Sequence, residues 1–98
     1  MTARATPSQY LHKLLKPDGS VVDYPPKDRA YTLEEVQKAV GGYIEVVNLN
    51  SGYIMVINEE GKLNGLPVNQ KATDLWGSPW DHIVGNALVC RSRGEDID

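Results

Sequence analysis

The segment Tyr53–Asn58 is apolar on both faces of the strand that its composition predicts. Side chains alternate between the two faces of a strand, and here neither face is polar before Asn58. A strand of this kind is central in a sheet and needs cover on both sides. The segment Tyr43–Leu49 is also rich in β-branched and aromatic residues, and Asn50-Ser51-Gly52 connects the two. The pair therefore predicts a β-hairpin whose second strand is central.

A helix is predicted over Leu33–Val40 by signals at both of its ends. Thr32 precedes it as an N-cap, and Glu35 lies three positions later, which completes a capping box. Apolar residues at i, i+3 and i+7 share one face, on which we expect Val36 to be buried. The double glycine at 41–42 ends the helix, because glycine adopts the left-handed C-cap conformation without steric cost.

The other elements follow from similar signals. A second short helix is expected over Gln70–Trp76, capped by Asn69 and closed by Gly77. Three more strands are expected: Tyr10–Leu15, Ser20–Tyr24 and His82–Cys90. We therefore predict an α+β fold, a small, mainly antiparallel sheet of four to five strands with two short helices packed on it. Residues 1–9 are expected to form a flexible leader, 10–91 the single domain and 92–98 a charged, flexible tail.

Composition excludes several classes of protein. Ten Lys+Arg against 13 Asp+Glu give a net charge of −3, which disfavours a nucleic-acid interface. No apolar run is long enough for a membrane span, and the first ten residues lack a signal-peptide core. A single cysteine, Cys90, excludes an internal disulfide framework and a Cys-rich zinc site.

No motif for catalysis stands out. No phosphate-binding glycine signature occurs, and Asn58-Glu59-Glu60-Gly61 lacks the spacing of a calcium loop. Cys90 lies in an apolar strand, where a buried and inert thiol is expected. Asp81-His82 could form part of a serine triad, but no nucleophile-elbow sequence accompanies it. We therefore expect no enzyme, no cofactor and no metal site.

The aromatic residues offer the best candidate binding surface. Trp76 is in helical register with the apolar face of its helix and is expected in the core. Trp80, in the turn that follows, is expected to be exposed as part of an apolar patch. Such patches mark a partner, a ligand or a homodimer contact. Some of Trp80, Tyr43, Tyr53 and Met55 are expected to remain exposed as this patch, with Glu45, Asn48 and Asn86 as a polar rim.

Three stretches together resemble a known family. They are Tyr31–Val47 with its Val-Gly-Gly-Tyr-Ile-Glu junction, Asn58–Asn69 with Asn-Glu-Glu-Gly-Lys and Gly-Leu-Pro-Val-Asn, and Ile83–Val89 with Ile-Val-Gly-x-Ala-Leu-Val. In this order they are similar to the domain of unknown function DUF3846, over about residues 11–90. The resemblance implies a bacteriophage or mobile-element accessory protein in a bacterial cytoplasm. It transfers no catalytic residue, because the family carries no established activity.

Three functions remain open at this point. The preferred one is a non-catalytic binding module that acts on a host protein, for example to counter a host defence. The alternative is a protein that sequesters a small ligand, such as a nucleotide signal, in an aromatic pocket. A small hydrolase would need His82, Asp81 and a serine to converge.

Overall fold

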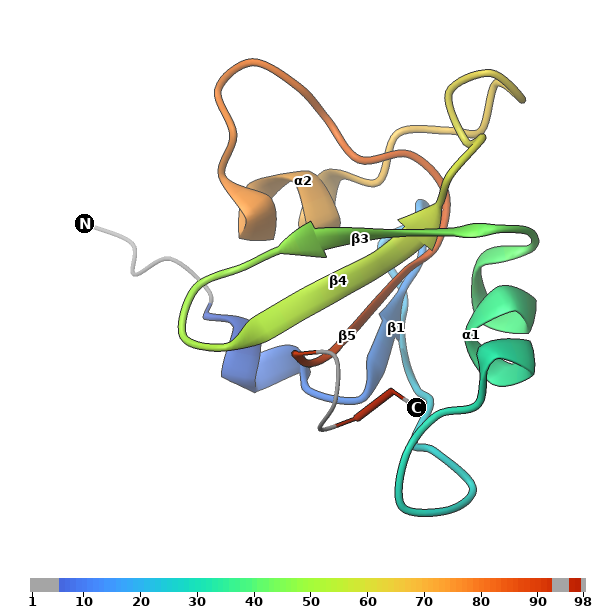
Figure 1. The fold of residues 1–98 in the computed structure, drawn as a ribbon. Coiled ribbons are helices and arrows are strands. Elements are labelled where there is room, and N and C mark those ends of the chain that lie inside the picture. The colour runs from blue at the N-terminus through green and yellow to red at the C-terminus, as the bar shows by residue number, and fades with distance from the viewer. Residues whose placement is uncertain (1–5, 93–95, 98) are drawn as a thin grey trace.

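The computed structural model describes residues 6–92 and 96–97 of the chain. Its strands form one five-stranded sheet of order β2-β1-β5-β4-β3, in which every neighbouring pair is antiparallel (Figure 1). In chain order the elements are a 3-10 helix η1 (Pro7–Tyr10), β1 (Lys13–Leu15), β2 (Val21–Asp23), α1 (Leu33–Val40), β3 (Ile44–Asn48), β4 (Tyr53–Asn58), α2 (Gln70–Trp76) and β5 (Ala87–Arg91). The predicted α+β fold is confirmed.

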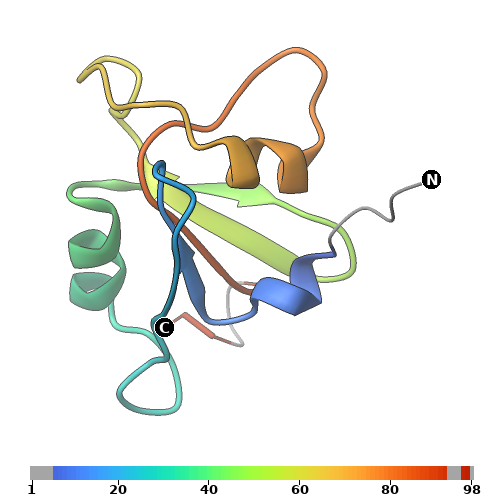
Figure 2. The ribbon, with the colours of Figure 1, turned by 180° about the vertical axis from the view of Figure 1, so that it is seen from behind.

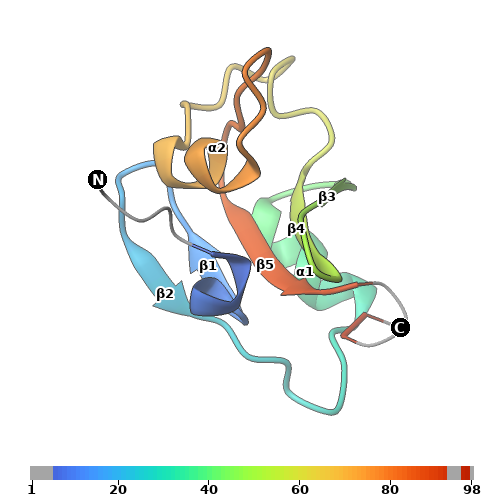
Figure 3. The ribbon, with the colours of Figure 1, turned by 90° about the vertical axis from the view of Figure 1, so that its left-hand side faces the viewer.

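The two helices cover opposite faces of the sheet (Figures 1 and 3). Strand β4 is interior, and its alternation sends side chains into both layers, as its apolar faces predicted. The α1-side core consists of Leu14, Tyr31, Val36, Ala39, Val40, Ile54, Val56, Leu88, Cys90 and Ile97. The α2-side core consists of Leu15, Val47, Met55, Ile57, Ala72, Ile83, Ala87 and Val89.

Both ends of α1 match the sequence prediction. The backbone N–H of Glu35 donates to the Thr32 hydroxyl at 3.1 Å, and the Glu35 carboxylate accepts from the Thr32 N–H at 3.0 Å. These bonds hold the pKa of Glu35 below its ordinary range, because the Thr32 amide stabilises the charged carboxylate. Gly41 ends the helix with φ +82°, a left-handed conformation that a Cβ would strain. Val36 is fully buried on the sheet.

The structure describes part of each of the ends that were predicted to be flexible. Residues 7–9 of the expected leader belong to η1, which ends at Tyr10. In the expected tail, Ile97 forms a parallel β-bridge with Tyr31. Its side chain is therefore held in the α1-side core and is only 3% exposed. Asp96 is also buried, and its carboxylate accepts the Arg91 N–H at 2.7 Å. Residues 1–5, 93–95 and 98 lie outside the described residues.

The last strand is shorter than its composition predicted. Only Ala87–Arg91 pairs in the sheet, whereas residues 82–86 form a connection. Gly85 breaks the strand with φ +74°, and a Cβ there would lie 2.8 Å from Leu66 Cδ1. The Gly85 N–H instead donates to the Pro67 carbonyl at 2.8 Å, which joins this connection to the segment before α2.

Candidate binding surface

Trp80 stands on the connection between α2 and β5 and is 92% exposed. α2 ends at Gly77, and the following turn is stabilised by the Trp80 N–H, which donates to the Ser78 hydroxyl at 3.3 Å. Trp76, one turn earlier, is half-buried against the α2-side core. The two tryptophans thus divide as the sequence predicted, Trp76 toward the core and Trp80 into solvent.

The base of this connection is fixed by hydrogen bonds. The Asn69 N–H donates to the Ile83 carbonyl at 2.8 Å, and the Ile83 N–H donates to the Thr73 hydroxyl at 2.8 Å. Val68 and Val84 form an isolated antiparallel bridge beside them. Trp80 is therefore presented by a loop whose two ends are held together.

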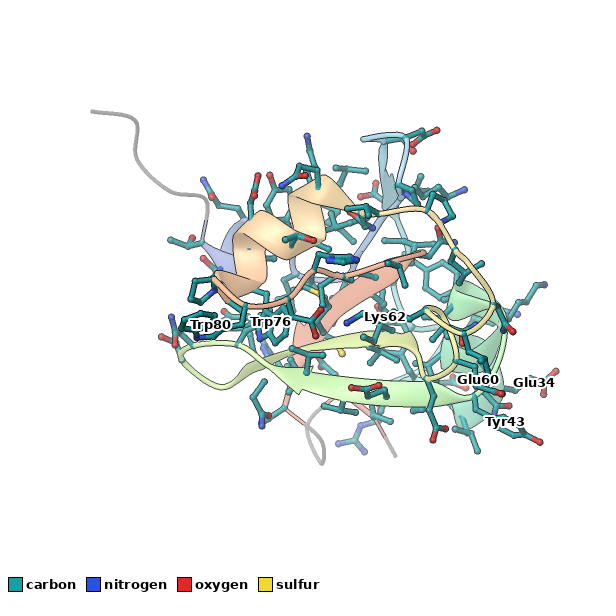
Figure 4. The ribbon with its side chains drawn as sticks, turned by 90° about the horizontal axis from the view of Figure 1, so that it is seen from above. Glu34, Tyr43, Glu60, Lys62, Trp76 and Trp80 are labelled. Atoms are coloured by element: carbon teal, nitrogen blue, oxygen red, sulfur yellow. The ribbon has the colours of Figure 1, made fainter. Side chains whose placement is uncertain are left out.

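A groove lies between the sheet and this connection. It has a volume of about 140 Å³, and its apolar floor includes Val47, Ile57 and Ile83. Figure 4 shows Lys62 and Trp76 along it, with Trp80 at the same end of the molecule as Trp76. We call it the acidic groove; its lining residues are Glu45, Val47, Ile57, Asn58, Glu59, Lys62, Trp76, Asp81, His82, Ile83 and Val84.

The charge of the acidic groove is negative. Lys62 forms an ion pair with Asp81, whose carboxylate also accepts the His82 N–H at 2.8 Å. The Lys62 hydrogen bond, with the His82 amide, holds the pKa of Asp81 below its ordinary range. Among the described residues, neither Glu45 nor Glu59 has an ion-pair partner. Two exposed carboxylates therefore remain uncompensated along the groove.

Comparison with known proteins places the chain in a family. A family model described as a domain of unknown function (DUF3846) matches residues 14–98, a span that includes all three stretches of the resemblance. The chain belongs to this family. No curated protein and no solved structure matches it.

The exposed aromatic residues of this DUF3846 domain do not form one patch. Tyr43 is 67% exposed, but it lies at the opposite end of the molecule from Trp80 (Figure 4). It borders a separate hollow with Gln37 and Asn64. Tyr53 is half-buried at the start of β4. Tyr43 and Trp80 thus do not share the single patch expected from the sequence, because they lie at opposite ends of the molecule.

Two of the expected surface residues have structural roles in the DUF3846 domain. Met55 is fully buried, because α2 and η1 cover the face of β4 on which it lies (Figure 2). Asn86 is half-buried, and its amide donates to the Ala39 carbonyl at 3.1 Å, so it ties the connection before β5 to α1. Glu45 and Asn48 are both exposed on β3, but their side chains lie on opposite faces of the strand, so the two residues do not border one patch.

The residues considered for catalysis in the DUF3846 domain do not form a triad among the described residues. His82 Nδ1 lies 4.0 Å from Asp81 Oδ1, and no described serine hydroxyl hydrogen-bonds His82. Burial, with the Asp96 charge, raises the pKa of the Cys90 thiol to about 12. His12 instead packs its Nε2 3.0 Å from Asp96 Oδ2, a pairing that the sequence separation of 84 hides.

The described part of the chain lacks two features, a metal-binding cluster and a membrane-spanning helix. No group of three or more His, Cys, Asp or Glu side chains there could hold a metal ion. No helix in it is both long and apolar enough to cross a bilayer. The uncompensated carboxylates and the apolar floor of the acidic groove suit a ligand that carries positive charge and apolar groups.

Proposed function

We propose that this DUF3846 domain is a non-catalytic binding module that acts on a protein of a bacterial host. The resemblance to phage and mobile-element proteins suggests an accessory role in the host cytoplasm, for example to counter a defence. Trp80 is the observation that carries the proposal. A tryptophan that is 92% exposed on a pinned loop presents a large apolar surface to solvent.

Tryptophan is enriched among the residues that dominate protein interfaces, where truncation to alanine costs about 2 kcal/mol or more of binding free energy. The loop is held at its base, so a partner would meet Trp80 without first ordering the chain there. The uncompensated Glu45 and Glu59 would add electrostatic selection for a partner with basic residues.

Sequestration of a small ligand is the weaker alternative. The acidic groove, at about 140 Å³, is below the roughly 300–1,000 Å³ of ordinary ligand pockets. Its carboxylates also oppose a phosphate-bearing nucleotide, because the one lysine on the groove already pairs with Asp81. These features favour a protein partner.

Affinity capture from host lysate tests the proposal, with a small-molecule extract of the captured domain analysed alongside. Trp80→Ala should lose a specific captured protein while its melting temperature stays within the small range of surface substitutions. Leu63→Ala is the matched control, because Leu63 is 82% exposed on the turn after β4. Equal capture by Trp80→Ala and wild type, or a co-purifying nucleotide with no protein, would contradict the proposal.

A further inference from the structure

Strand β3 forms an open edge of the sheet, and its backbone pattern identifies the groups that face outward (Figure 3). The Leu49 N–H donates to the Tyr53 carbonyl at 2.9 Å, and the Glu59 N–H donates to the Tyr43 carbonyl at 2.9 Å. Hydrogen-bonded pairs alternate along an antiparallel ladder, so odd-numbered residues of β3 face β4. The N–H and C=O groups of Ile44, Val46 and Asn48 therefore face away from the sheet.

Glu45 is the one charged residue on this edge, which otherwise lacks the usual protection against pairing with another strand. β3 has five residues, with no proline, glycine or lysine among them, and within the described part of the chain it pairs only with β4. The opposite edge, β2, has three residues and is followed by Pro25-Pro26, which cannot donate to a ladder. Of the two edges, β3 is the one suited to accept a further strand.

The negative charge of Glu45 on β3 favours an added strand that carries basic side chains. Glu45 lies on the same face as Val47, and both line the acidic groove. The residue of an added strand opposite Glu45 would form a non-hydrogen-bonded pair, the type in which side chains lie closest. A basic side chain there would pair favourably with Glu45.

The same charge opposes a second copy of this chain. In a symmetric pairing about Val46, Glu45 would lie opposite Val47 of the second copy, with the two Glu45 side chains diagonal neighbours about 7 Å apart. Each chain also carries a net charge of −3. The edge is therefore suited to a basic strand and is unsuited to self-association.

We propose that β3 is a strand-addition site that takes an extended segment of a partner protein, antiparallel to β3, with a basic residue opposite Glu45. This inference rests on the proposed protein-binding role and names the mode of binding. Backbone hydrogen bonds to Ile44, Val46 and Asn48 supply affinity, and Glu45 with the acidic groove supplies selectivity.

The probe is a capped peptide, Thr-Lys-Val-Lys-Val-Lys-Thr, titrated into the isotope-labelled full chain and followed by NMR. Its Thr and Val residues would hydrogen-bond β3, while its Lys residues would lie over Glu45 and the groove. The amides of Ile44, Val46 and Asn48 should then exchange more slowly with solvent. The counterpart with Glu in place of Lys should bind at least about tenfold more weakly.

Backbone methylation of the peptide tests the geometry on an unchanged protein. Methylation of both valine nitrogens should abolish binding, because those N–H groups face β3. Methylation of the backbone nitrogens of two lysines should leave the affinity within about twofold, because those N–H groups face solvent. Equal tolerance of the two patterns, or the reverse pattern, would overturn antiparallel addition.

Two protein variants complete the test. Val46→Pro removes an outward N–H at a position where an edge strand accepts proline, and with it a half-buried side chain that packs against the α1-side core. Provided that its melting temperature shows a folded domain, this variant should weaken peptide binding at least about tenfold. Glu45→Lys should reverse the preference to the acidic peptide. Failure of the basic peptide to bind, or a dimer in sedimentation that Val46→Pro dissolves, would overturn the proposal. In either case loss of host-protein capture by Trp80→Ala would leave the protein-binding role standing.

Discussion

Replacement of Asn69 by alanine should be among the most damaging single substitutions in this domain. Its side chain is fully buried and makes three hydrogen bonds. The amide donates to the carbonyls of Leu15 and Gly85 at 2.9 and 2.8 Å, and its oxygen accepts the Ala72 N–H at 3.1 Å. One side chain thus connects β1, the connection before β5 and the first turn of α2.

The magnitude follows from the groups left without partners. Each buried polar group that loses its partner costs about 1–3 kcal/mol, and three groups lose theirs here, so Asn69→Ala should lower the free energy of unfolding by at least about 3 kcal/mol. A domain of this size has about 5–15 kcal/mol in total. At about 4–8 °C per kcal/mol, the melting temperature should fall by at least about 12 °C.

Thermal unfolding followed by circular dichroism measures the fall in melting temperature of Asn69→Ala. Asn64→Ala is the matched control, because Asn64 is exposed. The control should change the free energy of unfolding by less than about 0.5 kcal/mol. Asn69→Asp distinguishes the N-cap of α2 from the bridging role, by which we mean the amide's bonds to the carbonyls of Leu15 and Gly85. Aspartate is a good N-cap, but its carboxylate cannot donate to those two carbonyls. A melting temperature for Asn69→Ala close to wild type would refute the bridging role, and a stable Asn69→Asp would reduce Asn69 to a cap.

Three further predictions concern the rest of the fold. Val36→Asp should unfold the domain in a melting experiment, because it places an unpaired charge in the α1-side core; an unchanged transition would show that this face is not buried. Cys90 should react slowly with a thiol reagent in the native protein and rapidly in denaturant, since burial raises its thiol pKa to about 12; rapid native labelling would contradict this. The pKa of Glu35 is lower in the folded protein than its ordinary value of 4.5, so the ionised carboxylate stabilises the fold at pH values above 4.5. Denaturant titrations should show this contribution being lost as the pH falls through the lower pKa of the folded state, and Glu35→Gln should lack the contribution. An identical pH dependence of stability in both proteins would count against the capping box.

Local signals predicted most of the secondary structure. The capping box at Thr32 and the left-handed Gly41 define α1 with little help from the rest of the chain. Apolar alternation in β4 correctly required cover on both sides. These features depend on residues a few positions apart, which is the range that a single sequence reveals.

The errors arose where distant segments meet. Met55 is buried because α2 covers its face, and nothing in its own strand shows which face stays open. Ile97 and Asp96 pack beside Tyr31 and His12, at separations that composition cannot reveal. Trp80 was correctly expected in solvent, but its separation from Tyr43 depends on the arrangement of the sheet. The acidic groove was likewise missed, although the cluster of acidic residues at 59–60 and Asp81 could have suggested a negative surface.

The position of β5 also has a consequence for the order of folding during synthesis. β5 is the last strand in the chain, yet it lies at the centre of the sheet between β1 and β4. Both hairpins, β1–β2 and β3–β4, emerge from the ribosome first, and neither can join the other until β5 pairs with both. The pairing of Lys13 with Val89 gives the fold a high contact order and slows its formation. Until then β4 presents an apolar, unpaired edge, so the nascent chain is most prone to aggregation just before residues 87–91 are made.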